Sequence, residues 1–192
     1  EQFLSEYWQK KPLLIKQGLP QLIDMFEPDD MLGLALEEDA SARLLTQAAS
    51  KKEGQAQWQL KKSPLAEADF NKLPDQWTVL VQNMEQWSPE LGQLWQAFDF
   101  IPQWQRDDIM VSYAPKGGSV GKHYDDYDVF LAQGFGSRRW QLGKFCDKNT
   151  EFVADEPIRL FDDMGEIIFD EILEAGDVLY VPPKLSHFGV AQ

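Results

Sequence analysis

A series of short β-type runs separated by turn residues fills the second half of the chain, and this pattern limits its fold more than any other feature. From Ile109 onward, segments rich in Val, Ile, Phe, Tyr and Trp alternate with segments that contain Gly or Pro. Many short strands joined by such turns are typical of sandwiches and small barrels. We therefore predict a β core over residues 106–192. The runs are IMVSYA, YDVFLAQ, RRWQLG, EIIFDEILE and DVLYVPP, and the turns are Pro115-Lys116-Gly117-Gly118, Gly134-Phe135-Gly136 and Ala175-Gly176-Asp177.

Residues 1–105 lack this texture and predict a mainly helical part that packs on the β core. Apolar residues have helical spacing before Pro12, and an acidic helix start follows at Glu27. The same spacing predicts helices over Trp77–Met84 and Leu91–Phe98. Short strands are predicted at 13–16, 43–45 and 58–60, the last two on either side of a polar loop. A chain of 192 residues suits one domain with such an appendage.

Charge and composition exclude several classes of protein. The formal net charge is −14, so the surface would repel phosphate backbones and attract a basic partner, although acidity also simply favours solubility. We therefore expect no direct nucleic-acid partner. No apolar run reaches the ~18 residues of a membrane span, and no signal peptide opens the chain. The single cysteine, Cys146, cannot form an internal disulfide, which predicts a reducing, cytoplasmic location.

The two histidines of the chain stand at two motif positions. His123 lies in GKHYDDYDVF, two residues before Asp125, and His187 follows DVLYVPPKLS. Residues i and i+2 of a strand point to the same face, and in a barrel a later strand can lie beside the first and bring His187 to it. Two histidines and one carboxylate leave coordination positions open, as in non-haem Fe(II) oxygenases, and zinc hydrolases can use the same ligands. Either motif alone is more often structural, so the coincidence of both favours a metal site.

An O2-activating metal also needs an electron source, usually a keto acid whose carboxylate tail requires a buried cation. In the run RRWQLG, alternation places Arg138, Trp140 and Leu142 on one face and Arg139 on the other. The face with Trp and Leu should be interior, so Arg138 is the predicted inward cation. A buried guanidinium suits a bidentate carboxylate, and a structural ion pair with one of the many acids is the alternative.

These motifs resemble a known family. The segments GKHYDDYDVFLAQGFGSRRWQLG and LEAGDVLYVPPKLSH are similar to the JmjC-type cupin oxygenases, which depend on Fe(II), 2-oxoglutarate and O2. The run from EYWQKKPLLIK through RDDIMVSYAPKGGSVGKHYDDYDVF more narrowly resembles the bacterial ribosomal oxygenases. The resemblance covers nearly the whole chain. It implies a double-stranded β-helix, a cupin/JmjC-like jelly roll, and hydroxylation of an arginine side chain in the sixteenth protein of the large ribosomal subunit.

The resemblance also implies roles for individual residues. His123, Asp125 and His187 match the family's iron ligands, and Arg138 matches the residue that binds the distal carboxylate of 2-oxoglutarate. Ser112 is a weaker candidate for a hydrogen bond to that carboxylate. Members of the group continue past this histidine into a further core strand, a dimerisation region and a winged-helix-like domain. We therefore expect the β core to be cut short at its C-terminal end, and a homodimer for the full-length family member.

Two alternative functions use the same features. A 2-oxoglutarate-dependent protein demethylase would apply the same iron chemistry to a methyl carbon, and nothing in the residues themselves separates it from a hydroxylase. A non-catalytic acidic cupin module would bind a structural metal or none. Asp126 and Asp128, beside the metal motif, could orient a basic substrate or serve as solvated acids.

Overall fold

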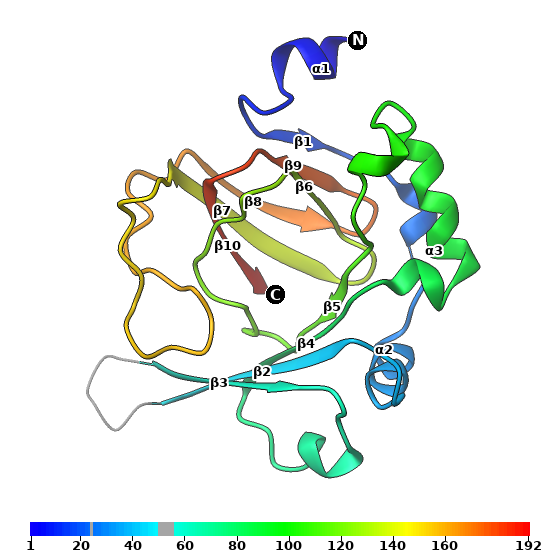
Figure 1. Ribbon diagram of the computed structural model, residues 1–192, viewed down its shortest axis with the longest axis vertical. Helices are drawn as coiled ribbons and strands as arrows, with labels where there is room; N and C mark the ends of the chain where they lie inside the picture. The colour runs from blue at the N-terminus through cyan, green and yellow to red at the C-terminus, as the bar shows by residue number, and fades with distance from the viewer. Residues whose placement is uncertain (24, 50–55) are drawn as a thin grey trace.

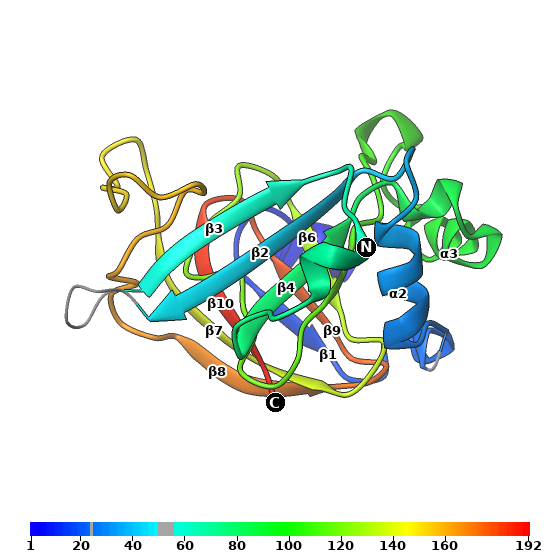
Figure 2. The same cartoon turned by 90° about the horizontal axis from the view of Figure 1, so that it is seen from below.

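The computed structural model describes residues 1–23, 25–49 and 56–192, and within these ranges ten strands form three antiparallel sheets (Figures 1 and 2). The strand orders are β1-β9-β6, β10-β7-β8 and β3-β2-β4-β5. Each of the five runs predicted after Ile109 contains a strand, so the prediction of a mainly β fold is confirmed. The strands are β1 (Leu13–Ile15), β2 (Ala42–Ala49), β3 (Ala56–Lys62), β4 (Gln76–Val81), β5 (Val111–Tyr113), β6 (Val129–Ala132), β7 (Ser137–Phe145), β8 (Phe169–Glu174), β9 (Val178–Val181) and β10 (Leu185–Ala191).

The helices are short and lie in the first 105 residues. Figure 1 shows α2 beside the sheet of β2 and β4, and α3 along one side of the molecule. None of the helices formed by the described residues is long and apolar enough to cross a membrane. The α-helices are α1 (Gln2–Glu6), α2 (Pro28–Ala35) and α3 (Pro89–Gln93), and the 3-10 helices are η1 (Pro20–Leu22), η2 (Glu67–Phe70), η3 (Met84–Gln86), η4 (Leu94–Phe98) and η5 (Gln103–Gln105).

The sheets β1-β9-β6 and β10-β7-β8 enclose a common core. All four residues of β9 are buried, because β9 is the central strand of its sheet and pairs on both sides. Leu179 and Val181 of β9 belong to one hydrophobic cluster with Trp140 and Leu142 of β7 and Leu173 of β8. Side chains that point inward from β7 therefore enter a space bounded by both sheets.

The N-terminal part differs from the mainly helical part that the sequence predicted for residues 1–105. It contributes β1 to the sheet of β9, and β2, β3 and β4 to the sheet that β5 completes (Figure 1). The helix predicted over Trp77–Met84 was wrong, because β4 occupies most of it. Aromatic and β-branched residues dominate that run and suit a strand, and alternate residues Val79 and Val81 pack in the core. The helical spacing of the same apolar residues was misleading.

Other N-terminal predictions are confirmed. The helix start at Glu27 is the first turn of α2, where the Asp30 carboxylate accepts a hydrogen bond from the Glu27 N–H at 3.0 Å. The run Leu91–Phe98 is helical as α3 followed by η4. Strands at 13–16, 43–45 and 58–60 correspond to β1, β2 and β3, and most of the polar loop predicted between the last two lies outside the described residues.

The carboxylate of Asp177 joins β1 to the turn that precedes β9. It is 2% exposed, accepts hydrogen bonds from the backbone N–H groups of Gln17 and Glu174 at 3.0 Å, and lies 2.8 Å from the Lys16 ammonium. Burial alone would raise the pKa of Asp177, but these hydrogen bonds more than offset it and the pKa lies below its usual value. The ionised carboxylate is thus a tie between the N-terminal strand and the β core.

We expect Asp177→Asn to lower the free energy of unfolding at pH 7 by ~1–3 kcal/mol, because the two buried N–H groups and Lys16 lose a charged acceptor. Because the folded pKa is depressed, this contribution is present above the ordinary carboxyl value of 3.8 and is lost as pH falls through the folded pKa. The variant should therefore lose less stability than the wild type below pH ~4. Urea unfolding at several pH values measures this, with Asp99→Asn, an exposed ion-pair carboxylate, as control. Equal stability of wild type and Asp177→Asn at pH 7 would contradict the tie.

Candidate metal centre

His123 and His187 are backbone partners although they are far apart in the chain. The His123 N–H donates to the His187 carbonyl at 3.1 Å, and the His187 N–H donates to the His123 carbonyl at 2.8 Å. His187 lies on β10 and also pairs with Leu142 of β7, at a register shift of the strand. The sequence prediction that a later strand brings His187 beside His123 is therefore confirmed.

Each histidine ring is held by a hydrogen bond to a backbone carbonyl two residues earlier. The Nδ1 atom of His123 lies 3.0 Å from the Gly121 carbonyl oxygen, and Nδ1 of His187 lies 3.0 Å from that of Leu185. Because a carbonyl oxygen only accepts, both contacts assign the hydrogen to Nδ1. The Nε2 atoms are then left with free lone pairs, which is how metal-binding histidines are usually prepared.

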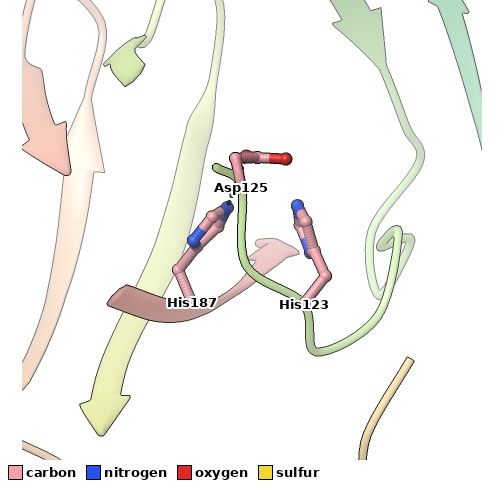
Figure 3. A group of neighbouring side chains, drawn as sticks. All are labelled: His123, Asp125 and His187. Atoms are coloured by element: carbon pink, nitrogen blue, oxygen red, sulfur yellow. Dashed lines mark ion pairs between the residues drawn. The ribbon is translucent and has the colours of Figure 1, made fainter. Parts of the chain in front are cut away.

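The Asp125 carboxylate completes the group (Figure 3). Its Oδ2 atom lies 3.4 Å from Nε2 of His187, and the two histidine rings are 4.2 Å apart between centroids. One ligand atom from each of the three residues can be chosen so that all lie within 4.8 Å of one another. The backbone carbonyl of Asp125 accepts a hydrogen bond from the Lys184 N–H at 2.6 Å, which ties the segment to the turn before β10.

The electrostatics favour the protonation states that a metal requires. Burial, followed by the charge of His187, lowers the pKa of His123 to about 4, so this imidazole is neutral at pH 7. Burial raises the pKa of Asp125, but the neighbouring imidazoles of His187 and His123 outweigh burial, so the pKa lies below its usual value. A neutral imidazole and an ionised carboxylate are the forms that bind a cation.

The local backbone differs from the strand that the sequence predicted around His123. Only an isolated bridge forms at this residue, and β6 does not begin until Val129. The i, i+2 spacing nevertheless identified two residues, His123 and Asp125, that the structure brings together. The next residue at this spacing, Tyr127, was not singled out from the sequence. Partial desolvation of its hydroxyl and then the charge of Asp125 raise the pKa of Tyr127 to about 12, although 63% of this residue is exposed. The spacing H-x-D-x-Y was the available signal.

The predicted alternation of β7 is confirmed. Arg138 and Trp140 are 8% and 7% exposed, whereas Arg139 faces solvent. The Arg139 guanidinium donates two hydrogen bonds of 2.6 Å to the Asp170 carboxylate on neighbouring β8. The two adjacent arginines therefore differ in their surroundings as the strand pleat requires.

Arg138 is a buried cation without a counter-charge. In residues 1–23, 25–49 and 56–192, no carboxylate forms an ion pair with it and no protein group accepts a hydrogen bond from its guanidinium, whose nitrogen atoms still reach solvent. Burial lowers the pKa of Arg138, but an arginine remains protonated at neutral pH. The structural ion pair that the sequence left open as an alternative is thus absent from the described part of the protein. The geometry leaves the guanidinium available to a bound anion.

Two further residues singled out from the sequence have other surroundings. Ser112 is exposed on β5 opposite Leu80 of β4, and its hydroxyl makes no hydrogen bond to the residues that the structure describes, so its role stays a prediction. Asp126 is exposed. Asp128 accepts hydrogen bonds from the Tyr180 hydroxyl at 2.5 Å and from the Gln9 side chain at 3.1 Å. It is therefore a structural acid that binds the N-terminal segment, neither a solvated acid nor a free one.

The chain is similar to known proteins over its whole length. The JmjC domain family matches residues 93–192. The chain is 62% identical to the probable ribosomal oxygenase of Haemophilus influenzae over all its residues and covers 46% of that protein. It is 38% identical to the ribosomal protein uL16 3-hydroxylase of Escherichia coli over 98% of its length, covering 48% of that protein. The chain thus spans about half the length of the curated relatives it matches.

A solved structure shows the same fold. The structure of YcfD, a ribosomal oxygenase from Escherichia coli in complex with cobalt and 2-oxoglutarate, matches with a TM-score of 0.80 and 37% sequence identity. The match covers 98% of this chain and 47% of that one. Together with the family match, it confirms the prediction of a JmjC/cupin-type fold.

We expect Arg138→Met to raise the free energy of unfolding of the ligand-free protein by ~1–4 kcal/mol, because the substitution removes a buried charge that has no ion-pair partner among the residues described. Arg139→Met should lower stability slightly, since it removes an exposed ion pair. Urea unfolding of both variants without added ligand measures the two signs. A loss of stability in Arg138→Met would show that the guanidinium already makes stabilising interactions in the ligand-free protein, which would contradict this prediction.

Proposed function

Because the chain belongs to the JmjC domain family, we propose that it is part of an Fe(II)- and 2-oxoglutarate-dependent oxygenase that hydroxylates an arginine side chain of the sixteenth large-subunit ribosomal protein. The observation that carries the proposal is the buried guanidinium of Arg138, which has no ion-pair partner in the described part of the chain. Arg138 lies on β7, the strand paired with the one that holds His187. A group of two histidines and one carboxylate fits several metals. Beside a cation that needs a carboxylate, it fits a metal with a keto-acid co-substrate.

The residues present fit these groups. His123, Asp125 and His187 would hold the iron, because both Nε2 atoms are free and the carboxylate is ionised. Three ligands leave coordination positions for a chelating co-substrate and for O2. Arg138 would bind the distal carboxylate of 2-oxoglutarate. When bound, iron and 2-oxoglutarate supply the oxidising chemistry: O2 delivers one oxygen atom to a substrate C–H bond and the other to succinate, with loss of CO2.

In this proposal, the protein's own share of catalysis is orientation and exclusion of water. His187 is 1% exposed, pairs with Leu142 of β7, and its ring lies 6.0 Å from that of Trp140. The two Nδ1–H hydrogen bonds fix the imidazole rings before any metal arrives. Ligands held in this way lose little freedom on binding, so the site is prepared for the metal rather than formed by it.

The charge of the chain supports a basic protein substrate. A formal net charge of −14 favours encounter with a basic ribosomal protein and disfavours direct binding to RNA. The relative from Escherichia coli is named for hydroxylation of uL16, the sixteenth protein of the large subunit. The same surface would suit a methylated basic peptide, which is the substrate class of the demethylase alternative. A homodimer of the whole protein remains a prediction from the family resemblance.

His123→Ala, Asp125→Ala and His187→Ala should each abolish Fe(II) binding and 2-oxoglutarate turnover, because each removes one of three ligands. Anaerobic titration with Fe(II) and then 2-oxoglutarate, followed by visible absorbance, measures complex formation. Asp126→Ala is the matched control, since Asp126 is the exposed neighbour of Asp125 and should leave the titration unchanged. Full succinate production by any of the three alanine variants would refute the assignment of that ligand.

Incubation of ribosomal protein uL16 with the protein, Fe(II), 2-oxoglutarate and O2 should add one oxygen atom to one arginine-containing peptide. The kcat/KM should fall several-fold between ~0.05 and ~0.5 M salt, because screening removes the electrostatic steering. Mass spectrometry separates the alternatives. A demethylase would remove a methyl group from a methylated peptide only, and a binding module would change no mass. No product from either this chain or one extended to the length of its relatives would contradict the proposal.

A further inference from the structure

The indole of Trp140 lies between the two halves of the proposed site. Trp140 is on β7, two residues after Arg138, and both side chains point inward. The Arg138 Cζ atom lies 5.9 Å from the centroid of the Trp140 ring. The His187 ring lies 6.0 Å from the Trp140 ring, inclined at 51°. One rigid side chain therefore neighbours both the buried cation and a candidate metal ligand.

Gly189 on β10 leaves the space that this indole occupies. Trp140 and Gly189 are paired across the two strands. A Cβ atom at Gly189 would lie 2.7–2.8 Å from three carbon atoms of the six-membered ring of Trp140. The backbone of Gly189 is not in the left-handed region, so the ring and not the backbone conformation requires glycine here. The indole thus lies directly against β10, at a position two residues after His187.

We infer that Trp140, seated on Gly189, is a positioning residue that holds Arg138 at the distance from the metal ligands that the co-substrate needs; this inference rests on the proposed function. Arg138 has no carboxylate to orient it among the described residues, so the ring of Trp140, 5.9 Å away, is a neighbour that can hold the cation in place. A cation over a ring keeps its N–H groups free, whereas a salt bridge would occupy them. 2-Oxoglutarate must bind the metal with one end and the guanidinium with the other. If the indole is displaced, Arg138 moves with it, and the separation of the two binding groups no longer matches the length of 2-oxoglutarate.

The competing explanation is that Trp140 only fills the core. It does belong to the cluster with Leu142, Leu173 and Leu179. A purely structural role predicts that any equal loss of packing in that cluster affects ligand binding equally. A positioning role predicts that the effect is confined to changes that move or remove the indole, and that it falls on 2-oxoglutarate affinity rather than on the metal alone.

The test measures the dissociation constant of 2-oxoglutarate by anaerobic titration of the Fe(II)-loaded protein. Gly189→Ala and Trp140→Phe should each weaken binding ~2- to 30-fold, the range expected for losing a cation–π contact. Phenylalanine lacks the outer ring that a Cβ at Gly189 would strike, so Gly189→Ala should add nothing further in the Trp140→Phe background. Leu179→Val, which loosens the same cluster on another strand, should leave the constant unchanged. Gly33→Ala, at an open helix position, controls for the glycine substitution itself.

Two results would overturn the inference. One is unchanged 2-oxoglutarate affinity in both Gly189→Ala and Trp140→Phe, with the fold verified by circular dichroism and with normal binding by the wild type. The other is a loss of affinity in Leu179→Val as large as that in Trp140→Phe, which would identify a general packing effect. A wild-type protein that binds no 2-oxoglutarate would reject the proposed function as well, so the two failures are distinguishable from the wild-type titration alone.

Discussion

The pair of backbone hydrogen bonds between His123 and His187 is the interaction on which the arrangement of the site depends. It joins an otherwise irregular segment to β10, whose other side pairs with β7. This bridge and the hydrogen bond from the Lys184 N–H to the Asp125 carbonyl together determine where Asp125 lies, because no strand includes this residue. Backbone pairing places residues more firmly than side-chain contacts do, since it fixes the positions from which the side chains extend.

The two parts of the site are prepared to different degrees. The imidazoles have hydrogen bonds that fix their rings, and their backbones are paired, so the metal ligands are ordered by the fold itself. The guanidinium of Arg138 has only an aromatic neighbour in the described structure, and its burial costs free energy until an anion arrives. A ligand that supplies the missing charge therefore stabilises the protein as it binds. The metal would thus bind to side chains that are already fixed. The co-substrate would bind to a buried cation that lacks an anion.

The sequence allowed the β core and the site residues to be predicted because their signals are local. Alternation along β7 separated Arg138 from Arg139, and the pleat alone was enough for that inference. The run Trp77–Met84 failed for the opposite reason: its apolar residues fit both periods, and only pairing with β2 and β5 makes β4 a strand. The division at residue 105 likewise ignored β1, which pairs with β9 from the far end of the chain. Pairing between strands that are distant in the chain cannot be predicted from a short segment of sequence.

The same limit explains why the sequence indicates only that Trp140 lies on the interior face of its strand. Its hydrophobicity indicates burial, but its neighbours depend on the register between β7 and β10, which puts Gly189 opposite it. Of the residues that face Trp140 across the strands, one has no side chain, and the indole occupies that space. A glycine in the interior of a strand ordinarily weakens it, so its presence here marks the close approach of another group. The register of β10 against β7 thus places Gly189 opposite the indole, and the bridge from the same strand to His123 places the metal ligands. A slip of β10 by one residue would therefore disrupt both contacts.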